Sequence, residues 1–198
     1  MTLYRRHRLP VEPERTVAFS GYRPAKLLSS SGSSEIFPIL VHQLSDILIP
    51  DLASRGYDTF LCGMAEGFDL LAGRAVLEAK KRLPHLRLFA VLPFPEQADS
   101  FALEWKKEHK EILSASEGSV VTSPRYWRGC FHQRNDTLVD NASVLVCYFD
   151  GQEGGTKYTV DRALKGNHRI LNLALEPSFW TPGSDSFTRN PFPEPVQK

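Results

Sequence analysis

The chain has 198 residues, of which 41% are hydrophobic and 24% charged, and its formal net charge is +1. This length and composition suit one soluble globular domain with a sizeable core. The near-zero net charge gives no general argument for a nucleic-acid or membrane partner, so neither is expected.

The cysteine and histidine patterns exclude further classes of site. The three cysteines are far apart and form no C-x-x-C pair, which predicts reduced thiols. The six histidines show no metal-ligand spacing, so we expect no metal. The basic N-terminal segment has no apolar signal region, and the longest apolar run is too short to cross a bilayer. A cytoplasmic protein is therefore expected.

Short apolar runs alternate along the chain with segments of helical periodicity. The runs that predict strands are 16–19, 58–62, 86–92, 120–121, 143–149 and 169–174. Apolar residues at helical spacing predict helices over 35–54, 68–79, 99–114, 131–142 and 159–164. This alternation predicts an α/β fold: a single Rossmann-like three-layer domain, with a mostly parallel sheet of about six strands and helices on both faces.

We assign residues 1–198 to this single domain, with its core over 16–174. The segments 1–15 and 176–198 contain prolines and show no periodic pattern. They are expected to be flexible arms or segments that wrap a neighbour.

Ligands of such folds bind outside the carboxyl ends of the strands, so the loops that follow the strands are the candidate sites. After the first strand, Gly21 permits a tight turn and Arg23 offers bidentate hydrogen bonds to phosphate or carboxylate. A structural turn with an exposed arginine is the alternative. After the second strand, Gly63 and Gly67 open a helix whose N–H groups would suit an anion. Asp69 in its first turn either complements the helix dipole or binds a ribose hydroxyl.

Two further loops carry polar groups. Arg134 would supply positive charge, and Asn135 occupies a core-facing helix position, where its amide needs either backbone partners or a ligand. After the fifth strand come Asp150 and the run Gly154-Gly155-Thr156, which opens a helix directly. Glycines allow close backbone approach and Thr156 can cap the helix or bond a phosphate oxygen, whereas a glycine-rich turn with a helix cap is the plain alternative.

The segment Arg125-Tyr126-Trp127-Arg128 precedes the helix that carries Asn135. Its aromatic rings would either stack on a base or anchor the loop in a partly buried position. The sequence contains no P-loop, no G-x-G-x-x-G after the first strand and no G-x-S-x-G elbow. No cofactor is therefore predicted.

These loops, with Leu92-Pro93-Phe94, resemble those of the YpsA-like family, which belongs to the SLOG superfamily with DprA/Smf and the Lonely Guy phosphoribohydrolases. The resemblance covers roughly residues 16–174. It implies a Rossmann-like sheet and a nucleotide-derived ligand, but no particular activity, because the superfamily includes enzymes, single-stranded DNA binders and sensors. The phosphoribohydrolases carry Pro-Gly-Gly-x-Gly-Thr-x-x-Glu with a catalytic glutamate, where this chain has Thr159. YpsA-like proteins are associated with bacterial cell division and have no assigned reaction.

The leading hypothesis is a protein that binds or senses a nucleotide or nucleotide-derived small molecule, with phosphate at Gly21 and at Gly154-Gly155-Thr156. The first alternative is a hydrolase of nucleoside monophosphates, for which Asp69, Asp136, Asp150 and Glu153 are the candidate carboxylates. The second is an interaction protein in cell division that recruits a partner through its proline-rich tail and exposed aromatics. A homo-oligomer is compatible with all three.

Overall fold

The computed structural model describes residues 2–4 and 9–174, so the predicted C-terminal arm lies outside the described residues. Seven parallel strands form one sheet in the order β1-β5-β4-β3-β2-β6-β7. The strands are β1 (Thr2–Tyr4), β2 (Thr16–Gly21), β3 (Thr59–Cys62), β4 (Arg87–Leu92), β5 (Gly118–Val121), β6 (Val144–Tyr148) and β7 (Arg169–Asn172).

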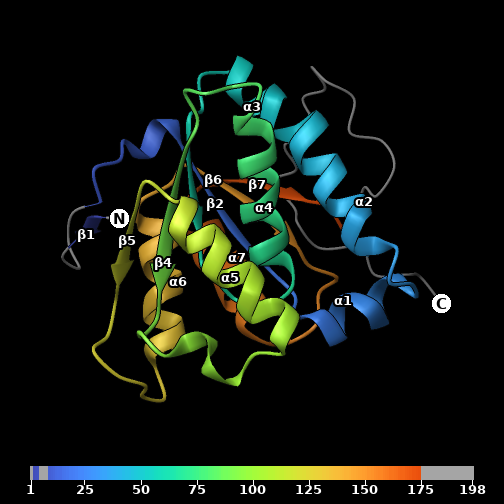
Figure 1. Ribbon diagram of the computed structural model, residues 1–198, viewed down its shortest axis with the longest axis vertical. Helices are drawn as coiled ribbons and strands as arrows, with labels where there is room; N and C mark the ends of the chain where they lie inside the picture. The colour runs from blue at the N-terminus through green and yellow to red at the C-terminus, as the bar shows by residue number, and fades with distance from the viewer. Residues whose placement is uncertain (1, 5–8, 175–198) are drawn as a thin grey trace.

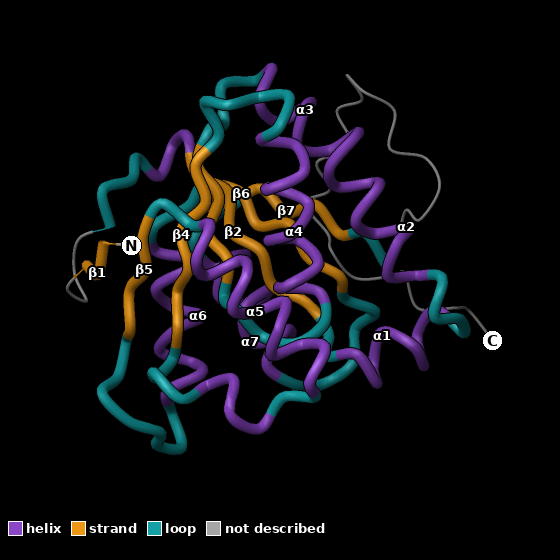
Figure 2. The backbone as a smooth tube through the Cα atoms, viewed as in Figure 1, coloured by secondary structure: helices purple, strands orange, loops and turns teal. Residues whose placement is uncertain are grey.

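Helices cover both faces of this sheet, as Figures 1 and 2 show. The helices α2, α4 and α5 lie on one face, and α6 and α7 lie on the other. The α-helices are α1 (Pro24–Ser31), α2 (Ile36–His42), α3 (Ile49–Ser54), α4 (Phe68–Lys80), α5 (Leu103–Ala115), α6 (Cys130–Asp140) and α7 (Gly155–Lys165). A π-helical stretch (Gln43–Leu48) joins α2 to α3, and two 3₁₀ turns lie at Pro13–Arg15 and Gln97–Ser100. The predicted three-layer Rossmann-like fold is confirmed.

The strands that the sequence predicts are all present, and β1 is an additional strand. It pairs with the outer edge of β5, with Thr2 opposite Gly118. This strand lies in the segment 1–15, which the sequence suggested would be a flexible arm or one that wraps a neighbour, and its three residues pair with the sheet. A three-residue strand is too short to show periodicity, and only its neighbour in the fold gives it partners.

Helix α1 was not predicted, although its sequence carries both end signals. Pro24 occupies the first turn, where its missing N–H costs nothing. Gly32 ends the helix with a φ of 76°, the left-handed conformation that glycine adopts freely. The serine-rich stretch between Leu28 and Ile36 obscured the apolar pattern.

The predicted helix over 35–54 is confirmed, with a π-helical centre. Pro50 has no N–H to offer the carbonyl of Asp46, and the wider π turn accommodates this break in the ladder. Among the described residues, Ile36–Ser54 is a helix apolar enough to cross a membrane, with a mean hydropathy of 1.3. It is a core helix of this domain, because its own side chains Leu44, Leu48 and Leu52 are buried in the hydrophobic core.

The sheet order places a crevice between β2 and β6. These strands are neighbours, but α1 follows β2 toward one face and α7 follows β6 toward the other. Loops that diverge from adjacent parallel strands leave an opening at the carboxyl edge, the usual ligand position in doubly wound sheets.

Candidate functional site

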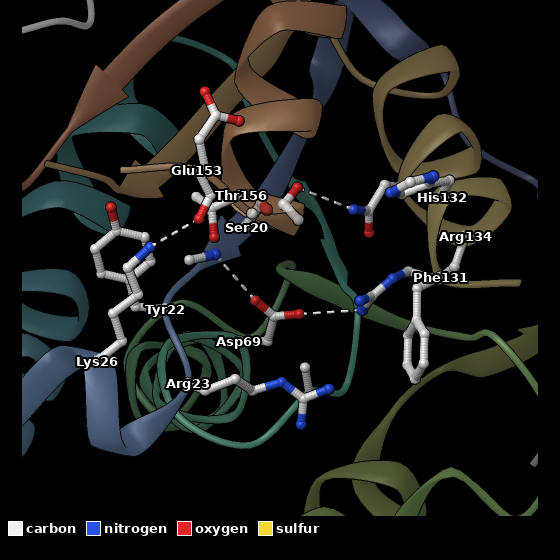
Figure 3. Close-up of a pocket in the computed structure, with 15 residues that line it drawn as sticks. Ser20, Tyr22, Arg23, Lys26, Asp69, Phe131, His132, Arg134, Glu153 and Thr156 are labelled. Atoms are coloured by element: carbon white, nitrogen blue, oxygen red, sulfur yellow. Dashed lines mark hydrogen bonds and ion pairs between the residues drawn. The ribbon is translucent and has the colours of Figure 1, made fainter. Parts of the chain in front are cut away.

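A cavity of about 410 Å³ opens at this crevice, a size within the range of small-molecule sites. Figure 3 shows its side chains converging from four segments that are distant in sequence. The predicted residues that line it are Gly21, Arg23, Asp69, Arg134, Asn135, Glu153, Gly154, Gly155 and Thr156. Lining residues that sequence reasoning did not single out for this cavity are Ser20, Tyr22, Lys26, Ala65, Phe131 and His132.

The N terminus of α7 points its free N–H groups at the cavity. Gly154 precedes the helix with a φ of 146° and has no side chain to cap it. Within the described residues, no acceptor is hydrogen-bonded to the N–H of Gly155, Thr156 or Lys157. Unsatisfied N–H groups and the positive end of the helix dipole together attract anions.

The position of Gly155 is not explained by packing. A Cβ atom there would meet no heavy atom within 4 Å, and Gly155 has no left-handed φ to maintain. The space beside it belongs to the cavity. The absent side chain therefore keeps the backbone N–H groups accessible from the cavity.

Two cationic side chains stand across from α7 (Figure 3). Arg23 is about half exposed, and its Nη1 lies 3.5 Å from Oε2 of Glu66. Lys26 donates a hydrogen bond to the carbonyl of Glu153 at 3.2 Å and lies 4.1 Å from the centre of the Tyr22 ring. Both are long, partly solvated side chains that can reorient toward an anion. Lys26 was missed because it lies on α1, one turn after Arg23.

Asp69 and Arg134 form a buried ion pair at the base of the cavity. Nη1 of Arg134 lies 3.1 Å from Oδ2 of Asp69, and both side chains are less than a tenth exposed. Burial raises the pKa of the Asp69 carboxyl, and the charges of Arg134 and Arg23 oppose that shift. Burial likewise lowers the pKa of the Arg134 guanidinium, with Asp69 opposing it. Arg134 is therefore held by the protein and is not a free cation of the cavity.

The glycines of the first two loops mainly serve packing. The N–H of Gly21 donates to Oδ1 of Asp69 at 3.2 Å, so it does not point freely at an anion. The carbonyl of Gly63 accepts a hydrogen bond from Arg134, and a Cβ at Gly63 would lie 2.6 Å from Oδ2 of Asp69. Gly67 has a φ of 86°, and a Cβ there would lie 2.5 Å from the carbonyl oxygen of Tyr22. Gly63 and Gly67 do not line the cavity.

Asp150 also lies outside the cavity lining and joins two loops. Its carboxylate accepts a hydrogen bond from the Tyr22 hydroxyl, and its own N–H donates back to that hydroxyl at 3.1 Å. Burial and the hydrogen bond to Asp150 raise the pKa of Tyr22 to about 12. Although burial opposes the change, the bonds from Tyr22 and Gln152 lower the pKa of Asp150. This pair ties the loop after β6 to the loop after β2.

Asn135 combines both interpretations that the sequence left open. Its Nδ2 donates a long hydrogen bond, 3.4 Å, to the carbonyl of Gly155, and the same side chain lines the cavity.

On the same helix, His132 stacks on Tyr158 with the rings 4.1 Å apart and 14° from parallel. The hydroxyl of Tyr158 donates a hydrogen bond to the carboxylate of Asp136 at 2.8 Å. Asp136, a candidate catalytic carboxylate, is therefore already bonded to a neighbouring side chain. No three His, Cys, Asp or Glu residues of the described ranges are grouped to hold a metal.

Comparison with curated proteins finds distant bacterial relatives of this chain. It is 27% identical over 117 residues to a UPF0398 protein of Halalkalibacterium halodurans, covering 58% of this chain and 62% of that protein. It is 28% identical over 102 residues to one of Brevibacillus brevis, covering 50% and 54%. The chain thus spans under two thirds of the length of these relatives. With a UPF0398 protein of Bacillus cereus the identity is 24% over 161 residues, covering 76% and 83%.

Solved structures share the fold at low identity. DNA processing protein A (DprA) of Streptococcus pneumoniae superposes with a TM-score of 0.55 at 15% identity, covering 80% of this chain and 50% of that chain. DprA of Helicobacter pylori, studied for its single-stranded DNA binding mode, gives 0.54 at 18% identity, covering 81% and 65%. These likenesses establish the fold alone.

A protein-family model named YpsA, described as the YspA SLOG family, matches residues 17–173. That range includes all the segments that line the cavity. The resemblance drawn from the loop motifs is confirmed, and this chain belongs to the YspA SLOG family.

Proposed function

We propose that the cavity between β2 and β6 binds a nucleotide or nucleotide-derived small molecule, with a phosphate group at the N terminus of α7. The observation that carries the proposal is the uncapped helix end at Gly154-Gly155-Thr156, whose free N–H groups face the cavity. A phosphate would accept hydrogen bonds from these groups and neutralise the end of the helix dipole. Arg23 and Lys26 would supply the opposing positive charges.

The remaining polar groups suit a ribose or base. The Asp69 carboxylate accepts hydrogen bonds from the N–H of Gly21, from Arg134 and from the backbone of Ala65, which fill three of its roughly four acceptor positions. A carboxylate oxygen has a further lone pair, so Asp69 can still accept from a ribose hydroxyl. The Asn135 amide, held near Gly155, is the second candidate for that contact. We further expect the protein to act in the cytoplasm with this small molecule, and not a nucleic acid, as its partner.

The test is a thermal-shift assay with a broad panel of nucleotides and nucleotide sugars. A ligand at about 100 times its Kd should stabilise the fold by about 2.7 kcal/mol, which raises Tm by roughly 5–10 °C. Gly155→Asp should remain folded, since its Cβ meets nothing, but should lose this shift because the new carboxylate repels phosphate. The matched control is Ser34→Asp, which adds the same charge at an exposed position just before α2. A panel that leaves wild-type Tm unchanged would contradict the proposal.

A second candidate is hydrolysis of nucleoside monophosphates, and the buried carboxyl of Asp69 at the cavity is the feature that favours it. A carboxyl with a raised pKa can serve as a general acid or base. Against it, Thr159 stands where the phosphoribohydrolases carry glutamate, and its hydroxyl donates to the carbonyl of Gly155 at 2.9 Å. Incubation with nucleoside monophosphates, followed by chromatography for free base, separates the two. Binding without turnover would exclude the hydrolase.

A further inference from the structure

The loop between β5 and α6 presents four consecutive exposed side chains, Arg125, Tyr126, Trp127 and Arg128, which we call the rim loop. Tyr126 is 63% exposed and Trp127 is 49% exposed. Large aromatic side chains that remain this accessible are typical of binding surfaces. The alternative, a partly buried loop anchor, accounts less well for the exposure of all four.

The rim loop is held in place although its side chains are exposed. The Tyr126 ring packs edge-on against Phe94, with the centres 5.6 Å apart. The Trp127 indole lies over Gly129, where any Cβ would overlap the ring. The Ser123 hydroxyl donates to the carbonyl of Arg125 at 2.7 Å. Rings held in this way lose little conformational entropy when a flat ligand stacks on them.

A chain of contacts joins the rim loop to the cavity. The Tyr126 ring lies 6.4 Å from the ring of Phe131, which lines the cavity. The guanidinium of Arg23 lies 6.0 Å from the same Phe131 ring, and Figure 3 shows both side chains on one side of the cavity. Through Phe131, the rim loop therefore borders the cavity at Tyr126.

The two positive charges of the rim loop, on Arg125 and Arg128, favour an anionic ligand. Within the described residues, neither Arg125 nor Arg128 forms an ion pair, whereas most other arginines of those residues do. Free guanidinium groups beside aromatic rings suit a phosphate linked to a base. The inner cavity of about 410 Å³ is near the lower end of the range for small ligands, so a second nucleotide unit would extend beyond it.

We propose that the rim loop is a second subsite, which binds the outer half of a dinucleotide: two nucleotide units linked through phosphate. The inner unit occupies the cavity, as proposed above, on which this inference rests. The outer base stacks on Trp127, and the linking phosphate contacts Arg125 or Arg128. The ligand class is therefore larger and more anionic than a mononucleotide.

Calorimetric titration with adenosine monophosphate, diadenosine diphosphate and the dinucleotide pApA tests this, with guanosine counterparts in parallel. We expect a dinucleotide to bind wild type roughly tenfold more tightly than the monophosphate, since one stacked base contributes that much. Trp127→Ala should abolish this excess and leave monophosphate binding unchanged. Trp127→Phe should retain most of it, which separates stacking from loss of the loop's fold. Arg125→Gln and Arg128→Gln should weaken the dinucleotide selectively, most strongly at low salt.

The controls are Ile39→Ala, an exposed apolar truncation on α2, and Lys107→Gln, an exposed charge removal on α5. Neither should alter any titration. Tighter binding of diadenosine diphosphate would indicate a free dinucleotide with a 5′–5′ linkage. Tighter binding of pApA would indicate the 3′–5′ linkage of a strand end. Equal affinity for mono- and dinucleotides, or rim-loop variants that behave as wild type, overturns the second subsite while the cavity proposal stands. If no mononucleotide or dinucleotide binds, both proposals are wrong.

Discussion

Asp69 connects three loops that the sequence lists as separate motifs. Its carboxylate accepts from the N–H of Gly21 and from Arg134, while Arg134 also donates to the carbonyl of Gly63. The backbone at the carboxyl ends of β2 and β3 is thereby tied to α4 and α6. Breaking a buried pair by removing one partner leaves an uncompensated charge, which is far more costly than losing a surface pair.

Arg134→Gln should therefore lower the free energy of unfolding by about 3 kcal/mol or more. The matched control is Arg162→Gln, which removes a partly exposed ion pair to Asp140 and should cost less than about 1 kcal/mol. Urea denaturation measures both. A double-mutant cycle with Asp69→Asn should show strong coupling with Arg134. Equal costs for the Arg134 and Arg162 variants would show that the buried pair does not stabilise the fold.

His109 makes stability depend on pH in the acid range. Burial lowers the pKa of its imidazole, and within the described residues its Nε2 has no hydrogen-bond partner. The unfolded chain, with an ordinary pKa of about 6.5, binds the proton more readily than the folded one. The contribution of the neutral ring is thus fully present above the ordinary pKa and decreases as pH falls below it.

Relative to His109→Phe, wild type should lose stability between pH 7.5 and pH 5.5, because only wild type must exclude a proton from this site. The phenyl ring can keep the edge-on contact with Phe101. Urea midpoints across this range measure the difference. His85→Gln, at an exposed position, is the matched control for removing a histidine. Parallel pH curves for wild type and His109→Phe would contradict the prediction.

At the scale of the element, two helices begin with glycine for opposite reasons. Gly67 precedes α4 with a φ of 86° and lies against the backbone of Tyr22. Gly155 begins α7 in open space. A side chain at the first position meets both backbone strain and a steric overlap, whereas at the second it meets neither.

Gly67→Ala should therefore destabilise the protein by about 2 kcal/mol or more, and Gly155→Ala should change the free energy of unfolding by less than about 1 kcal/mol, in the stabilising direction. Chemical denaturation of the two variants decides this directly, with each as the control of the other. If Gly155→Ala lowered the free energy of unfolding more than Gly67→Ala, the glycine at the start of α7 would be needed for folding. The proposal that it keeps an anion site open would then lose its main support.

At the scale of the whole molecule, the cavity lies at the carboxyl ends of β2 and β6. The helices that follow these two neighbouring strands lie on opposite faces of the sheet. The segments after β2 and β3 form one wall, and α6 with the start of α7 forms the other. A ligand that contacts both walls connects parts of the chain that otherwise meet through the sheet and a few side-chain bonds, including that of Tyr22 to Asp150.

A nucleotide that raises Tm should therefore slow amide exchange on both walls at once. Hydrogen-exchange mass spectrometry should show protection in peptides over 20–27 and over 150–160, because both carry groups that line the cavity. Peptides over 116–121, at the β5 edge, should serve as the unchanged reference. Protection restricted to one wall would mean that the ligand does not bridge the crevice.

The sequence by itself determined the fold class and the family. Alternating apolar runs and helical patterns were sufficient, because strand and helix periods follow from local geometry. The motifs after the strands also identified the correct sheet edge, since parallel strands bring their carboxyl ends together. β1 and α1 escaped notice: β1 has too few residues to show a period, and the serine-rich stretch after α1 obscured its pattern.

Only the tertiary structure decided which loop residues face the cavity. Gly63, Gly67 and Asp150 carry suitable signatures but lie outside the lining, while Arg134 is committed to Asp69. The sequence likewise did not determine whether Trp127 is exposed. These outcomes depend on contacts between segments up to 128 residues apart, such as Tyr22 with Asp150. A local pattern specifies the period and direction of a side chain, but its partners are set by how the elements pack.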